Sequence, residues 1–284
     1  MLQRERVSDN IYVFQSDLYA QVTAGLVVGD DWAVAIDTLA YPEETLEMRE
    51  FAEKELGLKV KYVILTHYHA DHSWGSCFFP GALVIAHQRC RELLATRGLE
   101  SLKAARRGNT VFQNTKIVLP QITFEQGQMQ LRVGKRLLTL FPLGGHSPDG
   151  IAVLCEDERI LFAGDAMMSL PVIVDGDLEE ARRSLKQLSE MGLENIVQGH
   201  GDVILRGEIE EAVQSNLDYL DAVVKAVRRT ARKKYALDDL RQSNVEACGK
   251  DRVLLAGLAE QLHLKNLVAV YRQLYGREPL SAGD

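Results

Sequence analysis

The feature that most constrains the fold is a run of three histidines and one aspartate within six positions. It reads Thr66-His67-Tyr68-His69-Ala70-Asp71-His72 and comes directly after the apolar, β-rich run 60–65. Imidazole and carboxylate groups are the ligands that zinc prefers where no thiolate is available. Because burying so many titratable groups without a metal would be costly, this run predicts a metal centre at the end of a strand.

The spacing within the run divides its members between two ions. Residues two apart on an extended backbone point the same way, so His67 and His69 can reach one ion together. Asp71 and His72 follow once the chain has begun to turn, and they can face a neighbouring ion. Asp71 is therefore both a candidate ligand and a candidate catalytic residue, whose second oxygen could orient a hydroxide and accept its proton.

Three further residues share a placement that suits metal ligands. His146 stands in the turn Gly144-Gly145-His146-Ser147-Pro148, Asp165 ends the run Ala163-Gly164-Asp165, and His200 stands in Gly199-His200-Gly201. Each follows an expected strand at the point where that strand gives way to a turn, which is where α/β scaffolds commonly place functional groups. The shared placement adds these three residues to the predicted metal site.

Residues 1–206 alternate short apolar runs with turns and helices, in two halves of similar design. Strands are expected at 11–15, 24–28, 32–36, 60–65 and 83–86 in the first half, and at 129–133, 137–143, 151–155, 160–163 and 195–197 in the second. Helices are expected after Pro42, from the strand at 83–86 to about Arg106, and from Leu178 to Met191. Two β-rich halves flanked by helices predict a layered α/β sandwich as the catalytic domain.

Residues 207–284 have helical texture with almost no strand signal. The apolar residues Leu217, Leu220, Val224, Val227 and Ala231 recur at helical spacing. Further helices are expected over 237–248, 252–262 and 265–275. We expect this segment to be a helical extension packed on the main body, acting as a cap or a dimerisation element.

A basic cluster lies mostly off that apolar face, at Lys225, Arg228, Arg229, Arg232, Lys233 and Lys234. It is expected to be a solvated helix surface. The alternative is a binding site for an anionic group.

The seven candidate ligands together resemble the metallo-β-lactamase-fold superfamily. The family motif His-x-His-x-Asp-His matches His67, His69, Asp71 and His72, and the later family positions match His146, Asp165 and His200 in the right order. The resemblance covers residues 10 to 205. It implies a four-layer αβ/βα sandwich, with the metals at one edge of the sheets.

The resemblance also implies how the ligands are shared. One metal would take His67, His69 and His146, the other would take Asp71, His72 and His200, and Asp165 would bridge them. The metals would be two zinc ions, with iron or manganese as alternatives. A hydroxide held between them would attack a small acyl substrate, namely an ester, thioester, lactone or lactam.

Departures from the better-known subfamilies leave the substrate open. The chain has Asp165 where the best-known zinc β-lactamases have cysteine, and Ser73-Trp74-Gly75 where glyoxalase II enzymes usually have paired glycines. Phosphoester hydrolysis is one alternative, and it would be favoured if the basic cluster faced the metals. An iron-dependent oxidoreductase such as a persulfide dioxygenase is an alternative of another class.

The surroundings of the site give weaker signals. Asp37, at the end of a strand, is a candidate to hold the free nitrogen of a ligand histidine. His87 and His263 are expected to be structural. The loops 19–23 and 108–115 are expected to line the pocket, together with an apolar surround that could equally be core: Trp74, Phe78, Phe79, Met167, Met168 and Leu170.

Composition limits the class of partner and the compartment. The formal net charge of −7 argues against non-specific binding to nucleic acid or an anionic membrane, leaving a small-molecule substrate and a homodimer as the expected partners. No apolar run is long enough to span a membrane, and no signal-peptide core follows Met1. The four cysteines lack paired spacing, so we expect a reducing, cytoplasmic setting.

Overall fold

The computed structural model describes residues 2–233 and 235–281, and two sheets form the centre of this part of the chain. The first sheet has seven strands in chain order: β1 (Gln3–Ser8), β2 (Ile11–Gln15), β3 (Thr23–Val28), β4 (Trp32–Ile36), β5 (Lys59–Ile64), β6 (Leu83–His87) and β7 (Ile122–Phe124). Strands β1 to β4 pair antiparallel, whereas β4 to β7 pair parallel.

The second sheet has six strands, which lie in reverse chain order. They are β13 (Ile204–Leu205), β12 (Asn195–Gln198), β11 (Ile160–Gly164), β10 (Ile151–Cys155), β9 (Arg136–Pro142) and β8 (Met129–Val133). Only β11 and β12 pair parallel; the other neighbours are antiparallel. The ten expected strands are present, and β1, β7 and β13 are additional short or exposed edge strands.

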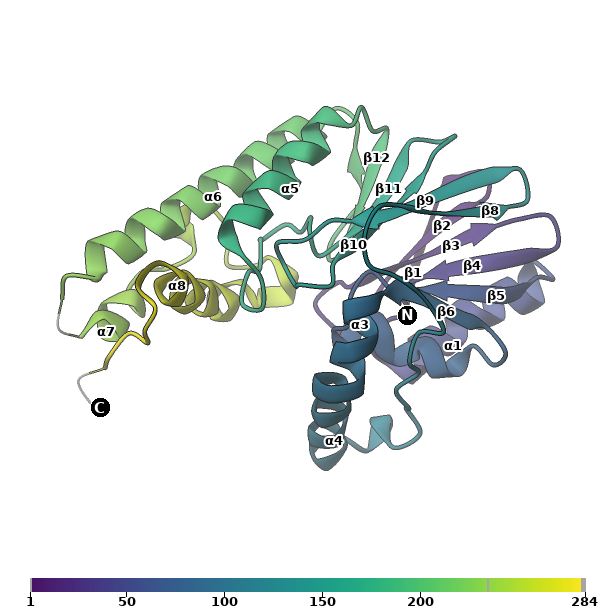
Figure 1. The fold of residues 1–284 in the computed structure, drawn as a ribbon, viewed down its shortest axis with the longest axis horizontal. Coiled ribbons are helices and arrows are strands. Elements are labelled where there is room, and N and C mark those ends of the chain that lie inside the picture. The colour runs from purple at the N-terminus through teal and green to yellow at the C-terminus, as the bar shows by residue number, and fades with distance from the viewer. Residues whose placement is uncertain (1, 234, 282–284) are drawn as a thin grey trace.

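Helices cover the outer face of each sheet (Figure 1). On the first sheet they are α1 (Pro42–Glu50), which continues as a π turn over Phe51–Glu55, and α3 (Gln88–Leu93). The chain continues beyond α3 into α4 (Leu99–Gly108), whose Leu102 packs with Trp74 and Phe112. On the second sheet the helices are α5 (Leu178–Glu190) and α6 (Ile209–Thr230). The expected four-layer αβ/βα sandwich is confirmed.

The two-residue period of the strands sorts side chains between the layers. On β3, Leu26 packs into the core under the outer helices, whereas Val27 packs into the core between the two sheets. On β10, Leu154 and Val153 divide in the same way, because successive strand residues point to opposite faces. This alternation determines which side chains of each strand lie between the two sheets.

The helical extension differs from its expected boundaries. A single helix, α8 (Ala259–Tyr275), runs through the predicted break between residues 262 and 265. The predicted helix 237–248 is only α7 (Ala236–Leu240) followed by a 3-10 turn, and the predicted helix over 252–262 begins only at Ala259. The 252–262 helix starts late because Leu255 and Ala256 adopt positive φ values of 56° and 55°, which an α-helix excludes.

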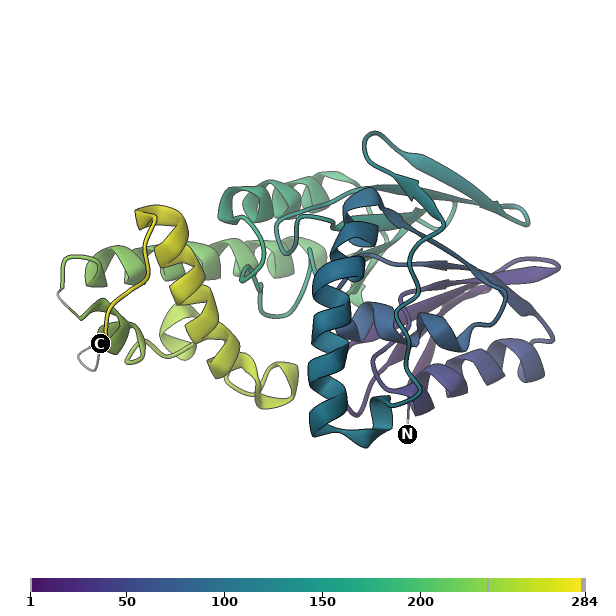
Figure 2. The ribbon, with the colours of Figure 1, turned by 60° about the horizontal axis from the view of Figure 1, so that its bottom comes forward.

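The helical extension shares one buried core with α5, β10 and β11; within it, α6 contacts β13 of the second sheet, and α8 packs on α6. Figures 1 and 2 show α7 and α8 at one end of the molecule, reached along α6. The buried face of α6 contains Tyr219, Leu220, Val223 and Val227, rotated slightly from the expected face, so that Leu217 and Val224 are only half-buried. Among the described residues, no helix has the length and apolar character needed to cross a bilayer.

Candidate metal centre

The seven predicted ligands converge at one edge of the two sheets, where the carboxyl ends of four strands meet. His67 follows β5, His146 follows β9, Asp165 follows β11 and His200 follows β12. The short helix α2 (Ala70–Ser73) turns the chain after His69 and brings Asp71 and His72 back toward the same edge. A hydrogen bond from Ile151 N to Thr66 O, 2.9 Å long, joins the two sheets here.

The seven candidate ligands form two separate groups. The first comprises His67, His69, His146 and Asp165, and the second comprises Asp71, His72 and His200. In the first group, His69 Nδ1 lies 3.0 Å from His67 Nε2 and 2.9 Å from His146 Nε2. In the second, His200 Nε2 lies 3.2 Å from Asp71 Oδ2.

Asp165 lies between the two groups and offers one carboxylate oxygen to each. Its Oδ2 atom is 3.2 Å from His146 Nε2 and faces the first group. Its Oδ1 atom is 3.1 Å from His72 Nε2 and 3.6 Å from His200 Nε2, in the second group. This is the placement that a bridging carboxylate requires.

Outer hydrogen bonds determine which ring nitrogen of each histidine faces the centre. His146 Nδ1 lies 2.6 Å from Val172 O, and His200 Nδ1 lies 2.9 Å from Ala20 O. Because a carbonyl oxygen can only accept, these Nδ1 atoms carry the hydrogen and leave Nε2 free as a donor to a metal.

Asp37 and Thr66 hold two more histidines in the same way. Asp37 Oδ2 lies 2.8 Å from His72 Nδ1, which confirms the expected contact between this carboxylate and a candidate ligand. The same oxygen accepts a hydrogen bond from Thr66 Oγ1, which lies 3.1 Å from His67 Nδ1, and Asp37 Oδ1 accepts from Thr66 N. One buried carboxylate thus orients ligands of both groups.

The ring of His69 is turned the other way from those of His146 and His200. No pattern in the sequence indicated the residue beside its outward-facing nitrogen. Its Nδ1 atom faces the centre, while Nε2 lies 3.8 Å from Asp175 Oδ2. Asp175 also accepts hydrogen bonds of 2.6 Å from Tyr68 and Arg97. Burial alone would raise the pKa of Asp175, but the nearby ring of His69 and the hydrogen bonds from Tyr68 and Arg97 lower it and keep the carboxylate charged.

Glycines leave the space that Asp165 occupies. A Cβ atom at position 199 would lie 1.9 Å from Asp165 Oδ1, so any side chain there would displace the carboxylate. Gly164 has φ +49° at an irregularity in the pairing of β11 with β12, a conformation that glycine adopts readily. These two positions aim Asp165 into the site.

The electrostatics of the centre favour a bound cation. Burial alone would lower the pKa of His200, but the carboxylates of Asp165 and Asp71 raise it to about 10. Burial would likewise raise the pKa of Asp71, yet His72 and His200 lower it to about 2. Within the described residues, His72 Nε2 and Asp165 Oδ1 are buried and, although only 3.1 Å apart, make no hydrogen bond of acceptable geometry, as expected for atoms that bind a metal.

The loop that joins β2 to β3 lies against the site. Val22 pairs with His200 in an isolated β-bridge, and Ala20 and Gln21 take positive φ values of 45° and 55°. Tyr19 on this loop remains 42% exposed, and the Asp71 carboxylate, together with burial, raises its pKa to about 12. In the second expected loop, 108–115, Phe112 packs against Trp74.

Other predicted residues have structural roles. His87 caps the N-terminus of α3 by accepting a hydrogen bond from Arg89 N, and His263 is buried beside Tyr219. Of the expected apolar surround, Phe78 is half-buried and the other five side chains are buried in hydrophobic clusters: Trp74, Phe79, Met167, Met168 and Leu170.

The sequence-family model of the metallo-beta-lactamase superfamily matches residues 19–200, which contain all seven candidate ligands. The chain belongs to this superfamily. A metallo-beta-lactamase family protein from Thermus thermophilus superposes with a TM-score of 0.71 at 20% identity, covering 95% of each chain. The likeness to that protein extends over the helical extension as well as the sandwich.

Two curated relatives have names that specify a reaction. Hydroxyacylglutathione hydrolase from Methylobacterium nodulans is 25% identical over 213 residues, 73% of this chain and 74% of the relative. Atrochrysone carboxyl ACP thioesterase from Aspergillus fumigatus is 26% identical over 160 residues, 56% of this chain and 44% of the relative. The chain spans about half the length of other curated relatives that it matches, 52% and 55% for two of them.

Proposed function

We propose that this protein is a metal-dependent hydrolase with two metal ions, and that it cleaves a small acyl compound such as an ester, thioester, lactone or lactam. The observation that carries the proposal is the position of Asp165, whose two oxygens face two separate groups of donors. When bound, two divalent ions would activate water and polarise the electrophilic oxygen of the substrate. Zinc suits the all-nitrogen-and-oxygen donor set, with iron or manganese as alternatives.

The residues of the chain would divide the remaining tasks. His67, His69 and His146 would hold one ion, Asp71, His72 and His200 the other, and Asp165 would bridge them. The Asp71 side chain is 15% exposed, whereas that of Asp165 is 5% exposed, so Asp71 is the carboxylate more open to solvent. It would orient the attacking water and accept its proton.

The two relatives with named reactions support the acyl class. One is named as a hydrolase of hydroxyacylglutathione and the other as a thioesterase, and both names describe cleavage of an acyl group from a carrier. We therefore place thioesters first among the acyl substrates to be tested.

The two alternatives, phosphodiester hydrolysis and persulfide dioxygenation, receive less support. Of the basic cluster, Lys225, Arg228 and Arg229 lie on the C-terminal half of α6, which leads away from the sheets (Figure 1). Arg232 and Lys233 follow the end of that helix, and Lys234 lies outside the described residues. A phosphodiester substrate at the metals would therefore not meet this cluster. A persulfide dioxygenase needs one iron, and the second donor group of Asp71, His72 and His200 favours two ions.

Initial rates on chromogenic substrates test the proposal. The panel comprises a thioester, a carboxylic ester, a lactone, a β-lactam and a phosphodiester, each with the zinc-loaded and the chelated protein. We expect metal-dependent turnover of an acyl substrate. Turnover confined to the phosphodiester, or turnover only after iron loading in a redox assay, would overturn the acyl assignment.

The role of Asp71 has its own test. Asp71→Asn keeps the size of the side chain but removes its capacity to accept a proton, so we expect kcat to fall roughly 100-fold or more. Metal content, measured by mass spectrometry, separates loss of an ion from loss of the base. The exposed Asp157→Asn variant is the matched control, and an Asp71→Asn variant with full turnover and both metals would exclude the role.

A further inference from the structure

The segment between β11 and α5 supports ligand histidines of the first donor group from outside the motif. Val172 O lies 2.6 Å from His146 Nδ1, and Asp175 Oδ2 lies 3.8 Å from His69 Nε2. Two of the three histidines in that group therefore depend on the position of residues 171–177, which have no regular secondary structure beyond turns.

Asn266 of α8 fixes the backbone on both sides of Val172. Its Nδ2 atom donates to Pro171 O at 2.7 Å, and its Oδ1 atom accepts from Ile173 N at 3.0 Å. Val172 lies between Pro171 and Ile173, and its carbonyl oxygen faces His146. A side-chain amide with one bond to each neighbour of Val172 leaves that carbonyl little freedom to rotate.

A second residue of α8 fixes the other end of the segment. Gln273 donates from Nε2 to Gly176 O and accepts from Leu178 N, each at 3.0 Å. Gly176 directly follows Asp175, the partner of His69. The two amides lie seven positions apart on α8, which is two helical turns, so one face of the helix carries both.

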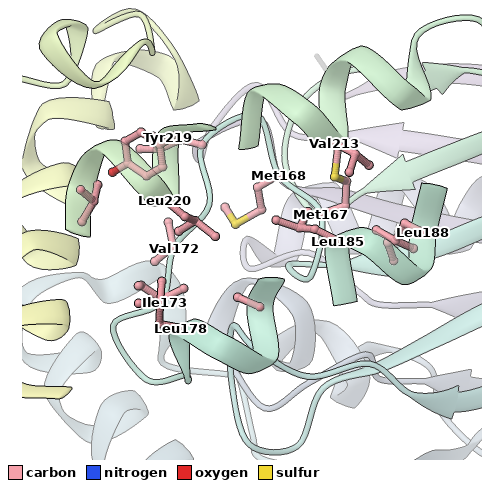
Figure 3. Packing of buried hydrophobic residues seen from close by; sticks show 14 of the residues in the cluster. Met167, Met168, Val172, Ile173, Leu178, Leu185, Leu188, Val213, Tyr219 and Leu220 are labelled. Carbon is pink, nitrogen blue, oxygen red and sulfur yellow. The ribbon is translucent and has the colours of Figure 1, made fainter. Parts of the chain in front are cut away.

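Asn266 is enclosed by buried side chains and has no contact with water. Asn266 is 0% exposed, and its remaining amide hydrogen bonds to the hydroxyl of Tyr219, which in turn bonds to His263 Nδ1. Val172 and Ile173 lie among buried side chains that include Leu178, Tyr219 and Leu220 (Figure 3). A buried amide without these bonds would be destabilising, so the contacts hold Asn266 in one orientation.

We propose that α8 is a positioning element of the metal centre, in which Asn266 and Gln273 hold the segment 171–178 so that Val172 and Asp175 orient His146 and His69. This inference rests on the metal centre of the proposed function. It assigns the helical extension a role in the affinity of the first donor group for its ion. In the second donor group, the outer partners of His72 and His200 are Asp37 and Ala20, which lie outside the segment that α8 holds.

The test measures metal affinity in two single-site backgrounds, without any substrate. Asp71→Ala leaves the first donor group intact, and His69→Ala leaves the second intact. Asn266→Leu is introduced into each, and the affinity for Zn²⁺ is measured by competition with a chromogenic chelator. The absorption spectrum with Co²⁺ reports ligand geometry in the same proteins.

We expect Asn266→Leu to weaken Zn²⁺ binding roughly 10-fold in the Asp71→Ala background and to leave it unchanged in the His69→Ala background. Tyr219→Phe is the matched control, because it removes a buried hydrogen bond of Asn266 but keeps both bonds to the segment. Gln273 is exposed, so Gln273→Leu provides a second variant if Asn266→Leu does not fold.

Equal weakening in both backgrounds, or the same weakening by Tyr219→Phe, would mean general destabilisation and would overturn the proposal. Unchanged affinity in the Asp71→Ala background would also overturn it. Failure of the proposed function is distinguishable, because a chain that binds two ions without acyl turnover still gives both affinities. A wild-type chain that binds no ion would overturn both proposals.

Discussion

Asp37 shows how much of the site depends on a residue that contacts no metal. It is 3% exposed, with φ +57°, a backbone conformation that aspartate and asparagine tolerate better than most residues. Its carboxylate accepts from Thr66 twice and from His72 once. The strained backbone places both oxygens toward the strand end that carries the motif.

Asp37→Asn isolates this role, because asparagine keeps the backbone conformation but its amide nitrogen cannot accept hydrogen bonds. We expect Zn²⁺ affinity to fall roughly 10-fold or more, since the rings of His72 and His67 lose their fixed orientation. Competition titration measures the loss, and circular dichroism of the chelated protein verifies the fold. Unchanged affinity in a folded variant would show that Asp37 does not orient the ligands.

Lys250 is a second residue whose environment has a measurable consequence. Its ammonium group donates to Ser215 Oγ and Asn216 Oδ1, each at 2.8 Å, and burial lowers its pKa from 10.5 to about 8. Below pH 8 both the folded and unfolded chains are protonated, so the folded state carries the full cost of the buried charge. Between pH 8 and 10.5 the unfolded chain binds more protons, and stability rises with pH.

Lys250→Met removes that titration while keeping a long side chain. We expect the stability of the wild type, relative to this variant, to increase as pH rises from about 7 to about 10. Thermal unfolding of both proteins at several pH values across this range measures the trend. A constant difference would show that Lys250 keeps an ordinary pKa in the folded protein.

At the scale of elements, one close contact sets how the two sheets pack. A Cβ atom at Gly25 of β3 would lie 2.1 Å from Phe162 Cε1 of β11. Phe162 is 3% exposed and belongs to the core between the sheets. Since Phe162 stands three positions before Asp165, the same contact bears on the strand that carries the bridging carboxylate.

Gly25→Ala should therefore cost about 1–3 kcal/mol of stability through overpacking. Phe162→Leu in the same chain should recover part of that loss, because it removes the ring that the new methyl group meets. Urea unfolding of both single variants and the double variant measures the coupling. Gly207→Ala, where no atom lies within 4 Å, is the control, and additive losses would argue against a direct contact.

At the scale of the whole molecule, the site joins parts of the chain that are distant in sequence. The donors come from both sheets, and the outer contacts add the β2–β3 loop and, through residues 171–178, helix α8. A metal bound here crosslinks both halves of the sandwich. It should therefore stabilise the entire fold and not only the loops around it.

Removal of metal tests this coupling. Ions that bind only the folded chain add about 2.7 kcal/mol of stability when free metal is at 100 times Kd. We expect chelation to lower Tm in one cooperative transition, and added Zn²⁺ to restore it in a concentration-dependent way. Differential scanning calorimetry measures both, and a Tm insensitive to chelator and zinc would mean that no ion couples to folding.

In the helical extension, the local sequence pattern predicts the presence of helices but not where they begin and end. The apolar spacing predicted helices there correctly but set their ends wrongly, because such spacing does not reveal the left-handed turn at Leu255 and Ala256. Strands β1, β7 and β13 had no clear signal, since edge strands need not alternate apolar and polar residues. Strand β11, which leads to Asp165, was predicted closely, because its residues are all buried and leave a strong apolar run.

The sequence by itself determined which donor groups form the candidate metal centre. Imidazole and carboxylate groups at strand ends, in the spacing of His67 to His72, specify a metal centre, because ligand type and local direction are properties of residues and backbone. The family pattern added His146, Asp165 and His200, and the structure places all seven together.

Only the tertiary structure decided how those donors are held. Val172 and Ala20 act through backbone carbonyls, which every residue has, so no residue type could indicate them. Asn266 bonds to Ile173 and Pro171 across 93 and 95 positions of sequence. Such contacts depend on which side chains the packed core places beside a given peptide group, and that is a property of the whole fold.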